Sequence, residues 1–117
     1  METTKVNQHL IGLSYNDIVP KLEFIENEGD CCGYASYDVV SELPEGTSTN
    51  NLVLKDCVQI QYDKEYADRC VLNFVFSAPE GELILGYELT AGSGSGWTYG
   101  AFVKVKLNDE VLAAASW

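Results

Sequence analysis

The stretch VLNFVFSAPEGELILGYEL, residues 71–89, decides the fold. Apolar and mixed residues alternate through 72–76 and again through 83–89, which is the period of a half-buried strand. Between the two runs, Ala78-Pro79-Glu80-Gly81 places proline and glycine where a chain reversal needs them. The stretch therefore predicts two antiparallel strands joined by a tight turn.

The same alternation extends on both sides of this hairpin. Residues 58–62 alternate Val58, Ile60 and Tyr62 with glutamines, and residues 101–107 alternate apolar residues with lysines. Residues 22–25, after Pro20, are a candidate fifth strand. Because short connections favour antiparallel neighbours, the strands from residue 58 onward predict a meander.

Each predicted strand has one apolar face, and such a sheet needs a cover of helices or of a second sheet. Two short helices are predicted by their end signals, one over 36–43 between Ser36 and Pro44, and one over 108–117 beginning at Asn108. Residues 44–51 form a polar, exposed loop. We expect a single α+β, mainly β domain over residues 1–117, in which an antiparallel meander of four to five strands is backed by one or two short helices.

Composition excludes several classes of function. The 117 residues carry 7 Lys and Arg against 18 Asp and Glu, for a net charge of −11, so direct binding of nucleic acid is unfavourable. No apolar run approaches the ~20 residues of a membrane span. The N-terminal residues lack an apolar signal core, so export is not expected.

The densest acidic stretch is a candidate binding surface. It consists of Glu23, Glu26, Glu28 and Asp30. Such a stretch is either a solvated face that keeps the protein soluble or a surface shaped for a basic partner. Trp97 and Tyr99 follow a glycine-rich segment, where aromatic side chains serve either as contact anchors or as core residues at the start of a strand.

The glycine-rich segment itself has two interpretations, a flexible connector or a ligand-binding loop. Gly94, Ser95 and Gly96 are followed by a predicted strand, whereas a dinucleotide loop needs a helix there. We therefore expect a flexible connector. The alternative is a loop that closes over a nucleotide-like ligand, with Lys104, Lys106 or Arg69 supplying positive charge.

Candidate metal ligands and nucleophiles are few. The cysteines are Cys31, Cys32, Cys57 and Cys70, and the one histidine is His9. No C-x-x-C pair is present, so we expect reduced thiols that pack as small apolar residues, with no metal and no cofactor. Oxygen ligands at 26–30 lack the pattern of a calcium loop. An enzyme that uses Cys31 or Cys32 as nucleophile remains an alternative, tested by thiol reactivity.

Three motifs in order resemble a known family. They are Leu10-Ile11-Gly12, Gly29-Asp30-Cys31-Cys32 and Gly94-Ser95-Gly96-Trp97-Thr98-Tyr99-Gly100. Their order over residues 10–107 resembles a family of short proteins of unknown function encoded by bacteriophages and their actinobacterial hosts. The more common family form has an acid after the cysteine pair, whereas Gly33 and Tyr34 follow here. The resemblance implies a phage or prophage setting and transfers no catalytic residue.

These observations favour a small acidic accessory protein without enzymatic activity. We expect it to bind and inhibit a host protein with a basic surface, such as a nucleic-acid-handling or defence protein, by electrostatic occlusion in the bacterial cytoplasm. The contacts would come from the acidic stretch together with the two aromatic residues. The alternative function is binding or sequestering a small, nucleotide-like ligand.

Overall fold

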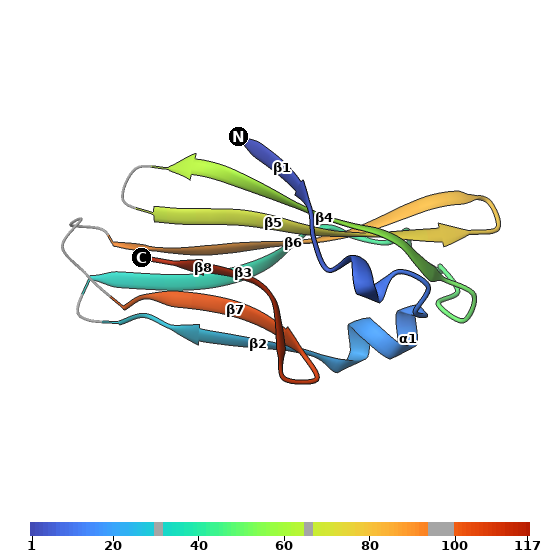
Figure 1. Ribbon diagram of the computed structural model, residues 1–117, viewed down its shortest axis with the longest axis horizontal. Helices are drawn as coiled ribbons and strands as arrows, with labels where there is room; N and C mark the ends of the chain where they lie inside the picture. The colour runs from blue at the N-terminus through green and yellow to red at the C-terminus, as the bar shows by residue number, and fades with distance from the viewer. Residues whose placement is uncertain (30–31, 65–66, 94–99) are drawn as a thin grey trace.

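Two antiparallel sheets pack face to face in the computed structural model, which describes residues 1–29, 32–64, 67–93 and 100–117 (Figure 1). The larger sheet has the strand order β1-β4-β5-β6-β3, and the smaller has the order β2-β7-β8. The strands are β1 (Glu2–Lys5), β2 (Leu22–Asn27), β3 (Gly33–Ser41), β4 (Val53–Lys64), β5 (Ala67–Ala78), β6 (Gly81–Ser93), β7 (Phe102–Leu107) and β8 (Glu110–Ser116). The mainly β fold class predicted from the sequence is confirmed, with five strands in the larger sheet.

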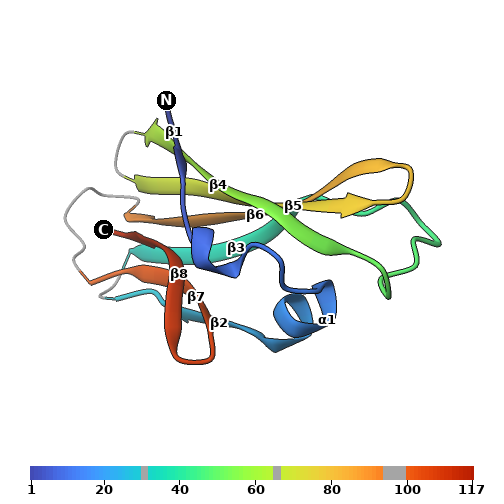
Figure 2. The same cartoon turned by 45° about the vertical axis from the view of Figure 1, so that its right-hand side comes forward.

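The helical turns of the described chain lie between β1 and β2. They are the 3-10 helices η1 (Gln8–Leu10) and η2 (Val19–Lys21) and the α-helix α1 (Tyr15–Ile18). Backbone hydrogen bonds tie this segment to β4, from Gly12 N to Leu54 O and from Tyr15 N to Leu52 O. The segment buries Leu10 and Ile18 in the core, and α1 lies toward the end of the larger sheet that the smaller sheet does not cover (Figure 2).

The predicted meander holds for three of its four strands. β4, β5 and β6 pair in sequence, and the turn at Pro79–Glu80 joins β5 to β6 as expected. β7 does not continue this sheet, because it pairs with β2 and β8 to form the second sheet. The second sheet covers the apolar face of the first, so burial of the two facing apolar surfaces holds the sheets together.

Both segments that the sequence predicted as helices are strands. Residues 36–43 fall mostly in β3, where Tyr37, Val39 and Val40 have the bulky and β-branched side chains that strands favour. Residues 108–117 form a turn and β8. Asn108 and Asp109 have φ values of 50° and 71°, as in the two-residue turn of a tight hairpin, so Asn108 does not cap a helix.

The apolar residues that alternate along β4 lie on the outer face of the larger sheet and not on the face that the second sheet covers. Gln59 is the register partner of Leu72, and Cys57 is the partner of Phe74, so the cysteine and the glutamines share the inner face. Val58 and Ile60 consequently lie half-buried on the outer face of the larger sheet. Alternation identified the strand correctly but did not identify which face turns inward.

The core between the sheets is aromatic and aliphatic. Its largest fully buried side chains include Phe74, Phe76, Leu72, Leu89 and Val103. The molecule extends over 48 × 27 × 27 Å, because the β5–β6 hairpin runs well past the smaller sheet (Figure 1). The exposed end of this hairpin and the 42–52 loop together form one end of the molecule (Figure 2).

Candidate functional site

The fold divides the acidic stretch that the sequence singled out. In the register with β7, Glu23 pairs with Lys106, which lies on the outer face of the smaller sheet. Glu26 pairs with Val103, a buried residue of the inner face, so Glu23 and Glu26 point to opposite sides of β2. Glu28 follows the end of the strand and is exposed, and Asp30 lies outside the described residues. The described carboxylates of this stretch therefore do not share one face.

The remaining predicted contact residues, Trp97 and Tyr99, lie outside the described residues, as do Gly94, Ser95 and Gly96 of the alternative ligand site.

The cations proposed for a nucleotide-like ligand lie on two different surfaces. Lys104 lies on the outer face of the smaller sheet, with Nζ 5.2 Å from the centre of the Phe102 ring, and Lys106 lies on the same face. Arg69 lies on the outer face of the larger sheet, over the Tyr62 ring at 4.1 Å and 3.5 Å from Glu88 Oε2. Because the core separates these faces, Arg69 and the two lysines do not share a pocket.

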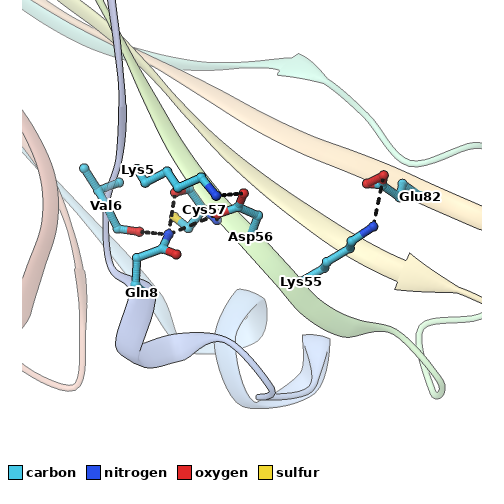
Figure 3. A network of polar contacts seen from close by, with 7 residues as sticks. All are labelled: Lys5, Val6, Gln8, Lys55, Asp56, Cys57 and Glu82. Carbon is cyan, nitrogen blue, oxygen red and sulfur yellow. Dashed lines mark hydrogen bonds and ion pairs between the residues drawn. The ribbon is translucent and has the colours of Figure 1, made fainter.

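The structure instead brings together three other carboxylates. Glu45 from the 42–52 loop, Glu80 from the β5–β6 turn and Glu82 from the start of β6 line one pocket of about 530 Å³. Leu52 and Leu83 contribute apolar surface to the same pocket. Lys55 Nζ lies 3.3 Å from Glu82 Oε1 (Figure 3). This end of the molecule therefore combines a concave shape with an excess of negative charge.

Turn chemistry sets the positions of these carboxylates. Thr47 N donates to Pro44 O, which closes a turn in which Gly46 has a φ of +81°. Residues with a side chain rarely adopt this φ, so glycine at this position holds Glu45 at the tip of the turn. In the β5–β6 hairpin, Pro79 restricts its own φ and places Glu80 next to it at the tip. The sequence predicted a turn at 78–81 and a polar loop over 44–51, but not that the two lie together.

A polar network links the N-terminal segment to β4. Gln8 Nε2 donates to Asp56 Oδ1 at 3.0 Å, and Cys57 N donates to the same carboxylate oxygen at 2.8 Å (Figure 3). Lys5 Nζ lies 3.4 Å from Asp56 Oδ2. The hydrogen bonds from Gln8 and Cys57, with the charge of Lys5, lower the pKa of Asp56 below its ordinary value of 3.8. The network fixes the chain between β1 and η1 onto the larger sheet.

The buried thiols are poor nucleophiles. Burial raises the pKa of Cys57 to about 11, and burial with nearby carboxylates raises the pKa of Cys70 to about 12. Both thiols are therefore protonated at neutral pH, and the expectation that they pack as small core residues is confirmed for these two. Cys32 is exposed, and Cys31 lies outside the described residues.

His9 forms a surface contact. His9 Nε2 lies 2.6 Å from Glu110 Oε1, and both side chains are about half exposed. This pair joins η1 to the β7–β8 hairpin.

Outside residues 30–31, 65–66 and 94–99, no group of three or more His, Cys, Asp and Glu side chains is arranged to hold a metal ion. Within those same limits, none of the helices is long and apolar enough to cross a membrane.

Comparison of the chain with protein-family models, with curated proteins and with solved structures found no match. The resemblance to short phage proteins stays a prediction.

Proposed function

We propose that this protein binds a partner protein with a basic surface and has no catalytic activity of its own. The observation that supports this proposal best is the pocket at the end of the molecule, where Glu45, Glu80 and Glu82 come together from two segments more than thirty positions apart. Lys55 offsets the charge of Glu82 alone. A lysine or arginine side chain of a partner would meet two further carboxylates and the apolar surface of Leu52 and Leu83.

The net charge of −11 supports the same proposal over longer distances. Attraction between this chain and a basic surface raises the rate of encounter and falls as salt is added. Where the basic surface of the partner is its nucleic-acid groove, occupancy by this chain excludes the nucleic acid. The proposed activity is therefore inhibition by occlusion, and a bacterial host protein is the proposed target.

The test compares two triple variants that have the same net charge. In the first, Glu45, Glu80 and Glu82 are changed to Gln, and in the second, Glu23, Glu26 and Glu28 are changed to Gln. The wild-type chain is used to capture its partner from bacterial lysate with elution by salt, and the purified partner is then titrated with all three proteins at two salt concentrations.

We expect the pocket variant to bind about tenfold more weakly, because three partly exposed pairs at ~0.5 kcal/mol each amount to about 1.5 kcal/mol. Its salt dependence should also be flatter. The β2 variant should stay within about twofold of wild type, since its carboxylates point to different faces. Equal effects of the two variants would show that the pocket has no special part in binding, and affinity that is independent of salt would contradict the electrostatic proposal itself.

A further inference from the structure

The two sheets have four outer strands, β1 and β3 in the larger and β2 and β8 in the smaller. The outer edge of such a strand presents backbone N–H and C=O groups that can pair with another chain, and natural proteins usually protect these edges. The four edges of this protein differ sharply in their protection.

The edge of β8 is closed by side chains of the rest of the molecule. Asn7 Nδ2 donates to Leu112 O at 2.9 Å, and Ser116 N donates to Asp68 Oδ2 at 2.9 Å. Between these two positions, Cys70 Sγ contacts the carbonyl oxygen of Ala114 at 3.7 Å. Every second residue from 112 to 116 therefore has a partner on the side away from β7.

The edges of β1 and β2 are short and charged. β1 has four residues, with Glu2 at one end and Lys5 at the other. β2 has six residues, with Glu23 and Glu26 on opposite faces. A strand added to either edge would have to desolvate these charges, which disfavours pairing with an arbitrary chain.

The edge of β3 has neither form of protection. The strand has nine residues and one charged side chain, Asp38. In the described part of the chain, β3 pairs with β6 alone. No backbone hydrogen bond from another described residue reaches the opposite edge of β3. A bulge at Val40 interrupts the regular pairing, so the unprotected stretch is Gly33–Val39.

The two faces of β3 differ in chemistry. On the inner face, Tyr37 is 40% and Val39 is 45% exposed, although Tyr37 stacks on Phe24 with the ring centres 4.2 Å apart. These apolar side chains therefore keep a substantial part of their surface exposed to solvent. An apolar side chain on an added strand would cover them.

On the outer face, Asp38 is the register partner of Glu88. Like charges directly opposite each other across two strands are destabilising. Arg69 Nε lies 3.5 Å from Glu88 and offsets that carboxylate, whereas no ion pair of Asp38 is found among the described residues. A cation on the far side of β3 would complement Asp38.

We propose that the β3 edge binds an extended segment of a partner protein as an added sixth strand of the larger sheet. The segment has apolar residues over Tyr37 and Val39 and a lysine or arginine beside Asp38. A second copy of this chain is the less suitable occupant, because each copy carries a net charge of −11 and the two copies would repel each other. This inference deepens the proposed function, since it rests on the partner being a basic protein.

The test uses the full-length chain and three synthetic heptapeptides. The first is a capped peptide of alternating lysine and valine, the second has glutamate in place of lysine, and the third is the lysine peptide with every backbone amide methylated. Affinity is measured by fluorescence polarisation. Hydrogen exchange of the backbone amides, followed by NMR, locates the bound peptide.

We expect the lysine peptide to bind about tenfold more tightly than the glutamate peptide and to slow exchange of amides within 33–39. The methylated peptide should not bind, because it cannot form backbone hydrogen bonds. Asp38→Lys should reverse the preference between the lysine and glutamate peptides. Glu2→Lys, which makes the same change in net charge at the opposite edge of the sheet, should leave the preference unchanged.

Three results would overturn the inference. They are equal binding of the methylated peptide, slowed exchange at another site, and concentration-dependent slowing within 33–39 without peptide, which would identify a second copy as the occupant. The outcome is separable from the proposed function, because the variant with glutamine at Glu45, Glu80 and Glu82 should still bind the peptide at β3. Failure of the peptide alongside salt-dependent capture of a partner would reject the edge and retain the function.

Discussion

Asp56 has a lowered pKa chiefly because of neutral hydrogen-bond donors. The side-chain amide of Gln8 has the largest effect, the backbone N–H of Cys57 comes next, and the charge of Lys5 contributes less. A carboxylate that accepts several hydrogen bonds is favoured in its charged form. The N-terminal segment is thus attached to β4 through an interaction that depends on ionised Asp56 (Figure 3).

Substitution of Asp56 by Asn should make stability depend less on pH. The pKa of Asp56 in the folded chain lies below the ordinary value of 3.8, so between the two values the unfolded chain binds more protons than the folded chain. The stabilisation that ionised Asp56 gives the fold is therefore complete above pH 3.8. It is lost as the pH falls through the folded-state pKa. The free energy of unfolding, measured by urea titration, should therefore differ most between wild type and Asp56→Asn at neutral pH, and the difference should shrink below pH 4.

A control distinguishes the effect of the hydrogen-bond donor Gln8 on this pKa from the effect of the charge of Lys5. In a titration followed by the NMR signal of the Asp56 carboxyl carbon, Gln8→Ala should raise the pKa more than Lys5→Ala does. A larger effect of the lysine substitution would mean that charge, and not hydrogen bonding, dominates this site.

At the scale of elements, β8 shows how packing overrides local preference. Its run of alanines favours a helix in isolation, yet Ala113 and Ala115 are buried against the larger sheet. Small side chains let β8 approach closely enough for Asn7, Cys70 and Asp68 to reach its edge. These partners are 44 to 105 positions away in the sequence, so no local pattern could predict the arrangement.

Removal of the Asn7 side chain tests the closure of this edge. Asn7 has a φ of 51°, so Asn7→Gly keeps the backbone conformation accessible. It removes the side-chain amide, which donates to Leu112 O at 2.9 Å and makes a longer contact of 3.7 Å with Cys57 Sγ. We expect a loss of about 1 kcal/mol in the free energy of unfolding, typical of one hydrogen bond. Asn50→Gly in the exposed loop is the control and should cost under ~0.5 kcal/mol. Equal losses would show that the amide does not stabilise β8.

Most strands could be predicted from the sequence because alternation is a local property. The predictions over 22–25, 58–62, 72–76 and 83–89 all fall within strands, and the prediction over 101–107 exceeds β7 by one residue at its start. The assignment of faces was not local. Cys57 and Gln59 point inward because the register with β5 places them opposite Phe74 and Leu72.

The candidate site was predictable only in part. Glu45 and Glu80 stand in turns that the sequence shows clearly, but their meeting depends on the hairpin that carries β5 and β6 past the smaller sheet. The acidic stretch at 23–30 was conspicuous in the sequence, whereas alternation along β2 sends Glu23 and Glu26 to opposite faces. Density of charge along a chain is therefore a poor guide to density of charge on a surface.

At the scale of the whole molecule, the two sheets depend on each other for burial. Phe24 of β2 stacks on Tyr37 of β3 and lies 5.1 Å, centre to centre, from the Tyr87 ring of β6. One aromatic side chain of the smaller sheet thus contacts two strands of the larger. Because side chains of the two sheets are buried against each other, we expect the molecule to unfold as one cooperative unit.

Phe24→Ala tests this dependence. Phe24 is half-buried, so we expect a loss of about 2 kcal/mol, below the 3–5 kcal/mol typical of a fully buried phenylalanine. Ile25→Ala, the next residue on the outer face of the same strand, should cost about 1 kcal/mol or less. Urea unfolding is followed by far-UV circular dichroism and by tryptophan fluorescence, and the two signals should give one shared transition in both variants. Separate midpoints for the two signals in Phe24→Ala would mean that the sheets unfold independently, and equal losses in the two variants would mean that Phe24 does not join them.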